Sequence, residues 1–521
     1  MTLASPKRLF NIRSMKVEMY EDVRYVAVSH VWGEQQMYTA TELGINGGVD
    51  WEIPLSDPNK IRRLVDAMNH FGYEYCWFDI LCMPQDRQDL INLEIPFMGD
   101  YYNGAEMTFV LLTTNYIASE SLTIWSNFMV DVIDKGRDFT AEEHKWFTYN
   151  RNILDMSGEV WFTRVWTLQE AILSNKIVLS GLDGSHLNLS DVLDGIRCLE
   201  AVNSTYSLLL FSKSYNLMPL SRAVKDRKAG EITSAEALSY NMERECHKIH
   251  DRFYGVLGIL GYKDLVVDYE MSIEDLNRTF AKYAYSKGDI SWMSVGGNIG
   301  NGFVQPMYRG FNNIGTGWTE IWPGSSGTIF GDKTLTVTVN LLGDVVHRAS
   351  FMETGLKSDK FIGWCVRTFR EWKFDDDDIC SAMEGFRTYP STNRQVAKVY
   401  LDGLSKGMEW DEMGMEMARL FGANAATKNM FAMFSIISDT NLLFRSATIV
   451  GVTSSVMAKR IALIVCGDAD IGDQIMLTKV ADKGSRFLGI IGERKGICLY
   501  GAKEIYDFFR ISKQISHEFL S

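Results

Sequence analysis

Residues 23–31 read VRYVAVSHV, a run that is rich in β-branched and aromatic residues and is nearly continuously apolar. Such a run predicts a β-strand buried on both faces, because a half-exposed strand would alternate apolar with polar residues. Asp57 and Pro58 then begin a predicted helix, with the aspartate at the N-cap and the proline at the first helical position. Gly72 ends this helix, and residues 75–80 (YCWFDI) form a second predicted strand.

The alternation of strand and helix continues along the chain. A helical stretch at 89–102 precedes a strand at 107–112, and a helix at 164–173 precedes a strand at 176–179. Strands that alternate with helices indicate βαβ units, and therefore an α/β fold with a parallel sheet covered by helices on both faces. The sequence thus predicts one such domain over residues 1–190.

The rest of the chain has two different patterns. Residues 191–320 are predicted to be mainly helical, and segment 273–287 places apolar residues at helical spacing. Residues 321–521 are predicted to be mixed α/β and rich in strands, because alternating runs such as 334–339 (TLTVTV) follow glycine-rich turns. A chain of 521 residues is too long for one core, which favours two or three domains.

The composition argues against several classes of protein. Contents of 46% hydrophobic and 23% charged residues are typical of a folded globular chain. The net charge of −13 argues against a broad nucleic-acid-binding surface, and no apolar run reaches the length of a membrane span. The eight cysteines are scattered, which indicates a reducing compartment, cytosolic or nuclear. We expect a cytoplasmic protein.

Several apparent ligand motifs do not meet their chemical requirements. Residues 468–473 (DADIGD) lack the glutamate that a calcium loop needs at its twelfth position, and residues 296–300 lack the spacing of a dinucleotide-binding loop. Cys246 and His247 lack the paired-cysteine spacing of zinc sites, so no metal site is predicted. The four aspartates at 375–378 are interpreted as a solvated loop.

Polar residues gather where the first two predicted strands end. The first strand runs into Ser29, His30, Trp32 and Gly33, and the second runs into Asp79. Open parallel sheets bind ligands beyond the carboxyl ends of their strands, so both groups are candidates for a binding site.

A second interpretation of the same strand ends pairs Cys82 with His30, as a thiol nucleophile and its base. Both residues lie at predicted strand ends, but their spacing does not place them within hydrogen-bond reach. We keep this arrangement as a minor alternative.

The helix at 164–173 (RVWTLQEAIL) carries an unusually placed carboxylate. Residues are about 100° apart around a helix, which puts Glu170 at the margin of a broad apolar arc, about 40° from Trp166. Desolvation at such a margin shifts the pKa of a carboxyl group, as is common at functional sites. The alternative is a structural carboxylate at the boundary of the core, satisfied by a nearby donor.

Three ordered blocks resemble the fungal heterokaryon-incompatibility (HET) domain. They are residues 25–33 (YVAVSHVWG), 77–86 (WFDILCMPQD) and 164–170 (RVWTLQE), with Glu94, Met98, Tyr102 and Ala105 at the family's intervals. Farther along, residues 251–258 (DRFYGVLG) and 267–269 (VDY) are similar to the region that follows this domain in many fungal proteins. The resemblance implies a TIR-like fold with a flavodoxin-like parallel sheet, and a role in self/non-self recognition and programmed cell death.

The resemblance also implies a reaction. TIR-like domains in several lineages cleave NAD at the nicotinamide–ribose bond with a glutamate in a Trp-Cys-x-x-Glu context. Residues 166–170 (WTLQE) are similar to that pattern, with Thr167 in place of the cysteine, so Glu170 carries over as the candidate catalytic residue. For NAD as substrate, Arg164 is a candidate to meet a phosphate, and Trp32 or Trp166 to stack on a base or on nicotinamide.

Two hypotheses follow from these observations. In the first, the chain is an NAD-hydrolysing cell-death effector without a resident cofactor, activated by self-association and by an unknown incompatibility partner. In the second, it is a non-catalytic module for homotypic signalling contacts. Glu170 is then a structural residue, the tryptophans belong to the core, and Arg164 pairs with Asp79 or Glu170.

Overall fold

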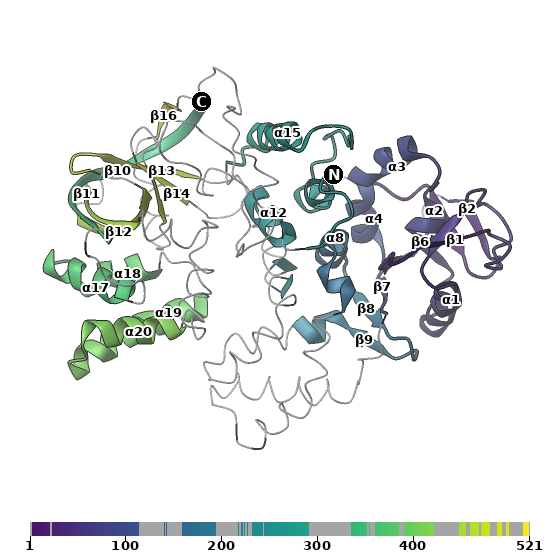
Figure 1. Ribbon diagram of the computed structural model, residues 1–521, viewed down its shortest axis with the longest axis horizontal. Helices are drawn as coiled ribbons and strands as arrows, with labels where there is room; N and C mark the ends of the chain where they lie inside the picture. Colours follow the sequence, from purple (N-terminus) through teal and green to yellow (C-terminus); the bar gives the residue numbers. More distant parts are fainter. Residues whose placement is uncertain are drawn as a thin grey trace. The chain divides into compact units, whose positions relative to one another are not determined.

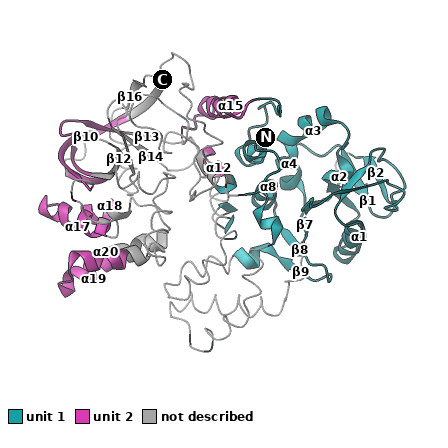
Figure 2. Ribbon diagram, in the orientation of Figure 1, with its two compact units in different colours: residues 1–232, 240–271 teal, residues 233–239, 272–521 magenta. Residues whose placement is uncertain are grey.

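The computed structural model divides into two compact units. Unit 1 comprises residues 1–232 and 240–271, and unit 2 comprises residues 233–239 and 272–521 (Figures 1 and 2). The structure describes residues 3–20, 23–113, 140, 142, 159–193, 217, 220, 221, 223, 224, 227, 232–242, 244–290, 335–351, 354, 360–384, 390–420, 447–454, 459–467, 470–479, 487–491, 496–499 and 514–519. The predicted boundary near residue 320 lies outside these residues, and the three-part division stays a prediction.

A seven-stranded mixed sheet forms the centre of unit 1, with the strand order β2-β1-β6-β3-β7-β8-β9. Its strands are β1 (Arg8–Asn11), β2 (Lys16–Met19), β3 (Val26–His30), β6 (Tyr75–Phe78), β7 (Thr108–Leu111), β8 (Ile177–Ser180) and β9 (His186–Asn188). The central strands β6, β3, β7 and β8 run parallel and are the strands that the sequence predicts. The α/β fold class is therefore confirmed for this unit.

The edges of the sheet differ from a purely parallel arrangement. β1 pairs antiparallel with β2 and with β6, and β9 pairs antiparallel with β8. Short turns join β1 to β2 and β8 to β9, and strands joined by a tight turn pair antiparallel, whereas parallel pairing needs a long crossover. The sheet is mixed because its first and last strands are added as hairpins.

Helices cover both faces of the parallel strands. On one face, Phe71 of α1 (Asn59–Phe71) lies 5.2 Å from Phe109 of β7 between ring centroids. On the other, Tyr102 of α4 (Met98–Gly104) lies 5.4 Å from Trp77 of β6. Gly72 ends α1 with a φ of 76°, as predicted. At the other end Pro58 is the N-cap and not the first helical residue, and Asp57 Oδ1 accepts a hydrogen bond from the N–H of Asn59.

The register of β3 decides which helices its side chains meet. Val28 is paired with Phe78 on β6 and with Phe109 on β7, so these three side chains share the face that α1 covers. Successive residues of a strand point to opposite faces. Ser29 therefore points to the face that carries α4 and α8 (Val165–Leu173), and His30 points back to the face that carries α1.

The helix predicted at 89–102 is broken into three pieces. These are α3 (Gln88–Glu94), the 3₁₀ turn η1 (Ile95–Phe97) and α4. Pro96 is the reason, because proline has no N–H for the helical hydrogen bond and its ring clashes with the preceding turn. The smaller elements of this unit are β4 (Gln36–Tyr38), β5 (Ile53–Leu55), α2 (Asp79–Cys82), η3 (Val160–Thr163), α13 (Asp251–Tyr254) and α14 (Leu257–Leu260).

A close approach of helices joins α14 to the sheet domain. A Cβ built on Gly258 would lie 2.7 Å from Cα of Gly99 on α4 and 2.9 Å from Oε1 of Gln169 on α8. A Cβ built on Gly99 would lie 2.5 Å from Cα of Gly258. Real side chains do not come this close, so the packing of α4, α8 and α14 depends on glycine at both positions.

We expect Gly258→Ala to destabilise unit 1 by about 1–3 kcal/mol, because an added methyl group in a filled contact forces the helices apart. Urea unfolding of the full chain should show the transition of unit 1 at a lower denaturant concentration. Leu93→Ala is the control, since Leu93 is 67% exposed and its truncation should have little effect. An unchanged transition in Gly258→Ala would contradict the close approach.

Unit 2 contains a second sheet, in which the described strands pair antiparallel in the order β11-β12-β15-β14-β13-β10-β16. They are β10 (Leu335–Ser350), β11 (Ala447–Ser454), β12 (Lys459–Gly467), β13 (Gln474–Lys479), β14 (Phe487–Ile491), β15 (Gly496–Leu499) and β16 (Gln514–Phe519). A further pairing of β10 with β11 closes the order into a ring. The long β10 makes closure possible because it bends at two register shifts, between Leu341 and Gly343 and between Val345 and His347.

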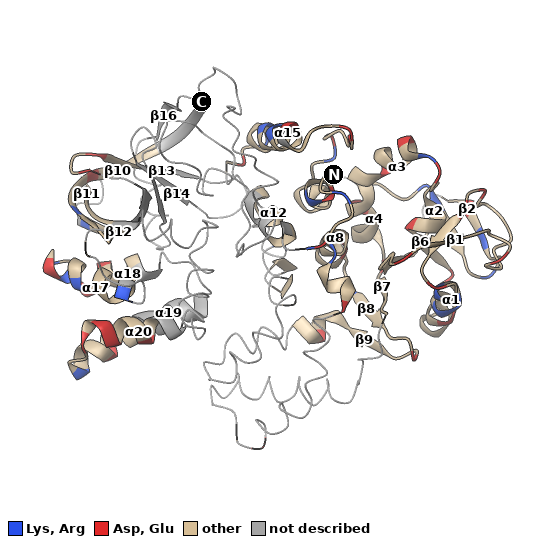
Figure 3. Cartoon of the chain, in the orientation of Figure 1, with Lys and Arg blue, Asp and Glu red and all other residues tan. Residues whose placement is uncertain are grey.

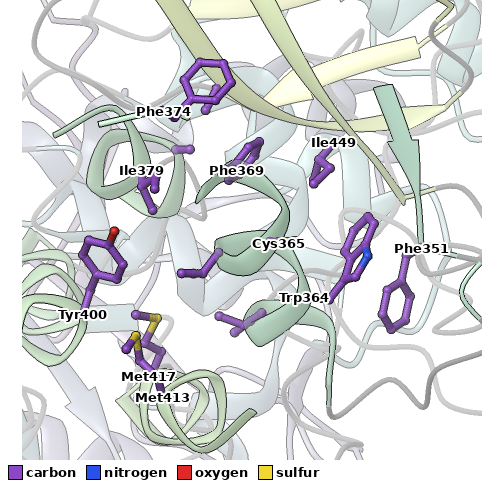
Figure 4. Packing of buried hydrophobic residues seen from close by; sticks show 14 residues of the cluster. Phe351, Trp364, Cys365, Phe369, Phe374, Ile379, Tyr400, Met413, Met417 and Ile449 are labelled. Atoms are coloured by element: carbon purple, nitrogen blue, oxygen red, sulfur yellow. The ribbon is translucent and has the colours of Figure 1, made fainter. Parts of the chain in front are cut away.

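Helices pack against this sheet through an apolar core. They are α17 (Phe361–Glu371), α18 (Asp376–Glu384), α19 (Pro390–Lys406) and α20 (Trp410–Leu420); α12 (Ser234–Met242) and α15 (Ile273–Ser286) lie earlier in the chain. Figure 4 shows Cys365 of α17 on the side of Met413 and Met417 of α20, and Phe369 of α17 on the side of Ile449 of β11. All five side chains are almost completely buried.

The aspartates at 375–378 do not form the loop predicted from their charge. Asp375 Oδ1 accepts a hydrogen bond from the backbone N–H of Asp378, and the next three aspartates form the first turn of α18. Carboxylates are stabilised at a helix N-terminus by its free N–H groups and its dipole. Arg370 and Tyr400 also donate hydrogen bonds to Asp376.

Charged residues of both signs are interspersed over the described elements of the two units (Figure 3). Within the described residues, no helix has the length and apolar character needed to cross a membrane. The expectation that the chain does not bind nucleic acid stays a prediction.

Candidate functional site

The side chain of Glu170 lies where β3 and α8 meet. Ser29 Oγ donates a hydrogen bond to Glu170 Oε2, and Trp161 Nε1 donates one to Ser29 Oγ at 2.6 Å. Trp161 belongs to η3, directly before α8. Glu170 is 6% exposed, and Ser29 and Trp161 are each 1% exposed. The three groups therefore form a buried polar contact between a strand and a helix that are distant in sequence.

Burial raises the pKa of the Glu170 carboxyl to about 8, although the hydrogen bond from Ser29 opposes this rise. The negative charge of Asp79 raises the pKa further, whereas the neighbouring Tyr102 hydroxyl and the positive charge of Arg244 lower it. Desolvation has the largest effect, so the carboxyl of the free protein is mostly protonated at pH 7.

The other face of β3 carries a second chain of polar contacts. Lys60 Nζ, from α1, lies 3.3 Å from His30 Nδ1. His30 Nε2 lies 3.3 Å from Asp79 Oδ1, although its direction is poor for a hydrogen bond. Trp32 Nε1 donates a hydrogen bond to Asp79 Oδ2 at 3.2 Å. Burial lowers the pKa of His30, and its imidazole is therefore neutral at pH 7.

Asp79 is the group that links the two faces. It begins α2 directly after β6, and its side chain is 17% exposed. Its oxygens contact His30 and Trp32, and its charge acts on Glu170. Asp79 and the half-buried Trp32 are more accessible to solvent than the buried Ser29, His30 and Glu170.

Most of the site residues predicted from the sequence lie at this edge of the sheet: Ser29, His30, Trp32, Asp79 and Glu170. Gly33 follows in the same loop, is exposed, and has a φ of 66°. A Cβ built on it would lie 3.1 Å from Cβ of Ser56, so both the backbone conformation and the close contact favour glycine here.

The backbone of Arg164 and the side chain of Trp166 contact a different part of unit 1. The carbonyl oxygen of Arg164 accepts a hydrogen bond from Arg244 Nη1 at 3.0 Å, and Arg164 forms an isolated parallel bridge with Glu245. The Trp166 indole acts on the carboxylate of Asp251, where it opposes the rise in the pKa of that group. Within the described contacts, Arg164 forms no ion pair with Asp79 or Glu170. Any role of Arg164 and Trp166 toward a ligand stays a prediction.

The contacts of Cys82 argue against a thiol nucleophile paired with His30. The Cys82 sulfur accepts a hydrogen bond from the backbone N–H of Phe78 and donates one to the carbonyl of Cys76. Burial raises the pKa of the Cys82 thiol to about 12, which disfavours the reactive thiolate. His30 is engaged with Lys60 and Asp79 instead.

Sequence reasoning missed three residues around the site: Lys60, Trp161 and Arg244. Lys60 lies four residues before Leu64, at the start of the apolar stripe of α1. A lysine on the apolar face of a helix indicates a buried charge with polar partners, so the sequence did contain a signal for this residue. Trp161 and Arg244 gave no comparable signal, because their contacts depend on chain segments far apart in sequence.

These features define an α/β domain with a buried carboxyl at the carboxyl ends of its parallel strands. Residues 25–170 match the family model described as heterokaryon incompatibility protein (HET). Residues 25–170 thus form a HET domain, as the three sequence blocks predicted.

The chain is also similar to heterokaryon incompatibility protein 6, OR allele, of Neurospora crassa, with 24% identity over 252 residues. The match covers 38% of this chain and 36% of that protein, so the chain spans about a third of the relative's length. No solved structure matches the chain.

We expect Glu170 to make folding less favourable as the pH rises from about 4.5 to about 8. The carboxyl has a pKa of about 8 in the folded protein and an ordinary value of 4.5 otherwise. Below this window both states are protonated; within it only the unfolded state ionises, so stability falls progressively and then levels off above about pH 8.

Glu170→Gln cannot ionise and should lack this loss. Thermal unfolding of the full chain should therefore show a variant that gains stability over wild type between about pH 5 and about pH 8. Glu34→Gln, a change at an exposed glutamate, serves as the control. Parallel pH profiles for wild type and Glu170→Gln would show that Glu170 is not held in its neutral form.

Proposed function

We propose that the chain is an effector of heterokaryon incompatibility, acting in self/non-self recognition and programmed cell death. The HET domain at residues 25–170 and the incompatibility protein of Neurospora crassa support this proposal. We expect the protein to act in the cytoplasm, to respond to an incompatibility partner protein and to self-associate on activation.

We also propose that the HET domain is TIR-like, with a flavodoxin-like sheet. Taken in chain order, the four parallel strands are arranged 2-1-3-4, as β6, β3, β7 and β8. This arrangement agrees with the 2-1-3-4-5 order of flavodoxin-like sheets. Ligands of such sheets bind where the strand order reverses, outside the carboxyl ends, which here is between β3 and β7. Ser29 and His30 end β3 at that point.

The proposed reaction is cleavage of NAD at the nicotinamide–ribose bond, with Glu170 as the catalytic residue. Nicotinamide leaves as a neutral molecule, so the reaction does not need the second carboxyl that protonates the leaving group in ordinary glycosidases. A carboxylate beside the ribose stabilises the developing oxocarbenium charge, and this effect is largest where water is excluded. The observation that carries the proposal is the burial of Glu170 at the strand ends, bonded to Ser29 and next to Asp79.

The protonated state of Glu170 in the free protein is compatible with this chemistry. A cation near a carboxyl lowers its pKa, and the nicotinamide ring of NAD carries a positive charge. Binding of NAD would therefore favour the carboxylate form that the reaction uses. The partly exposed Trp32 and Asp79 are the proposed first contacts for the ligand, and Ser29 the residue that orients Glu170.

The second candidate function is a non-catalytic module for homotypic contacts. It is favoured by the same burial, because a glutamate that is 6% exposed and hydrogen-bonded to Ser29 also fits a structural link between α8 and β3. The two functions differ in what Glu170→Gln does. In a structural role the amide keeps a hydrogen bond to Ser29, whereas in catalysis it cannot supply negative charge.

The test is release of nicotinamide from NAD by the purified full chain, measured with and without forced oligomerisation. We expect wild type to release nicotinamide and Glu170→Gln to be at least about 100-fold slower, in line with the loss of a catalytic side chain. Asp79→Asn should reduce the rate less, because Asp79 acts on Glu170 and on the ligand without taking part in bond cleavage.

Glu34→Gln is again the matched control, since it removes an exposed carboxylate and leaves the fold unchanged. If the wild-type protein releases no nicotinamide even when oligomerised, the hydrolase function is excluded and the interaction module is favoured. Equal rates for wild type and Glu170→Gln would show that Glu170 is not the catalytic residue.

A further inference from the structure

Lys60 is a buried lysine at the site that the proposed reaction does not use. It lies in the first turn of α1 and is 2% exposed. Its Nζ donates hydrogen bonds to the carbonyl of Val31 at 2.6 Å and to Ser56 Oγ at 2.8 Å, and lies 3.3 Å from His30 Nδ1. An ammonium group has three protons to donate, and three acceptors surround this one.

The contact between Lys60 and His30 determines where the imidazole carries its proton. An ammonium group can only donate, so a hydrogen bond between Lys60 and Nδ1 requires Nδ1 to be the acceptor. The neutral ring of His30 then has its proton on Nε2. That nitrogen faces Asp79 Oδ1 at 3.3 Å, and an N–H there is attractive, whereas a lone pair would be repelled by the carboxylate.

The same ammonium holds the loop after β3 in place. Val31, whose carbonyl accepts from Lys60, directly precedes Trp32. Ser56 accepts a hydrogen bond from Lys60 and also lies against Gly33, since a Cβ built on Gly33 would lie 3.1 Å from the Cβ of Ser56. Trp32 in turn donates its indole hydrogen bond to Asp79. Lys60 is thus connected to Asp79 by two routes, through His30 and through the loop.

We propose that Lys60 is a positioning residue of the HET-domain site. Its ammonium fixes His30 in the tautomer with the proton on Nε2 and holds the loop 31–33, so that His30 and Trp32 both present N–H groups to Asp79. The expected effect of Lys60 on NAD cleavage rests on the proposed function, whereas the tautomer of His30 and the loop contacts do not.

The test uses the full chain labelled with ¹⁵N at its eight histidines and measures nitrogen–proton correlations at neutral pH. The His30 signals are assigned by their loss in His30→Asn. We expect wild type to show a protonated Nε2 and an unprotonated Nδ1 that accepts a hydrogen bond. In Lys60→Met, Nδ1 should shift to the position of a free acceptor, while Lys7→Met, a change at an exposed lysine, should leave it unchanged.

A proton on Nδ1 of wild-type His30 would overturn the proposal, and this measurement needs no variant of Lys60. An unchanged Nδ1 signal in a folded Lys60→Met would overturn it as well. If wild type releases nicotinamide, Lys60→Met should release it more slowly and Lys7→Met at the wild-type rate. If wild type is silent toward NAD, the proposed reaction fails while the histidine signals still decide the role of Lys60.

Discussion

The two-residue period of β3 is the constraint on which the site depends. Ser29 and His30 are adjacent in sequence, and the pleat of the strand sends them to opposite faces of the sheet. Ser29 meets Glu170 of α8 on one face, and His30 meets Lys60 of α1 on the other. A shift of one residue in the register of β3 would exchange these partners and dismantle both contacts at once.

Burial gives this edge of the sheet its unusual chemistry. Desolvation dominates at Glu170, whose pKa rises to about 8, and at Lys60, whose pKa falls to about 8. Glu170 is thus protonated, and Lys60 deprotonated, more readily than usual, and the two side chains lie on opposite faces of β3. Asp79 lies between them, less buried than either. The protein therefore places the partly exposed carboxylate of Asp79 next to two buried groups whose pKa values are shifted toward neutrality.

The folded unit extends beyond the part of the chain that matches the HET family. The match ends at Glu170, within α8, but β8 and β9 continue the sheet. The segment from 244 to 260 also belongs to the same packing, since Arg244 donates to Thr167 and Gly258 lies against Gly99. Removing the chain after residue 170 would leave α8 without the residues that cover it, so the site is a property of the larger unit.

The sequence by itself determined the central strands, the C-terminal end of α1, the α/β class and the HET domain, because these depend on local periodicity, caps and short motifs. It also identified Ser29, His30 and Asp79 as candidate site residues, since they lie at predicted strand ends. Glu170 was identified from its place at the margin of an apolar helix face and from the family resemblance. It did not predict the antiparallel edges of the sheet or the break at Pro96, where hairpin turns and a missing N–H outweigh the broader pattern.

Only the tertiary structure decided which of these residues meet. Ser29 and Glu170 are 141 positions apart. The backbone of Arg164 and the indole of Trp166, which are close to Glu170 in the sequence, contact Arg244 and Asp251 instead. Lys60 contacts His30 because α1 packs on the sheet, and Trp161 contacts Ser29 because of the turn that precedes α8. Such contacts depend on how whole elements pack, and this packing is set by the complete core and not by any local stretch of the chain.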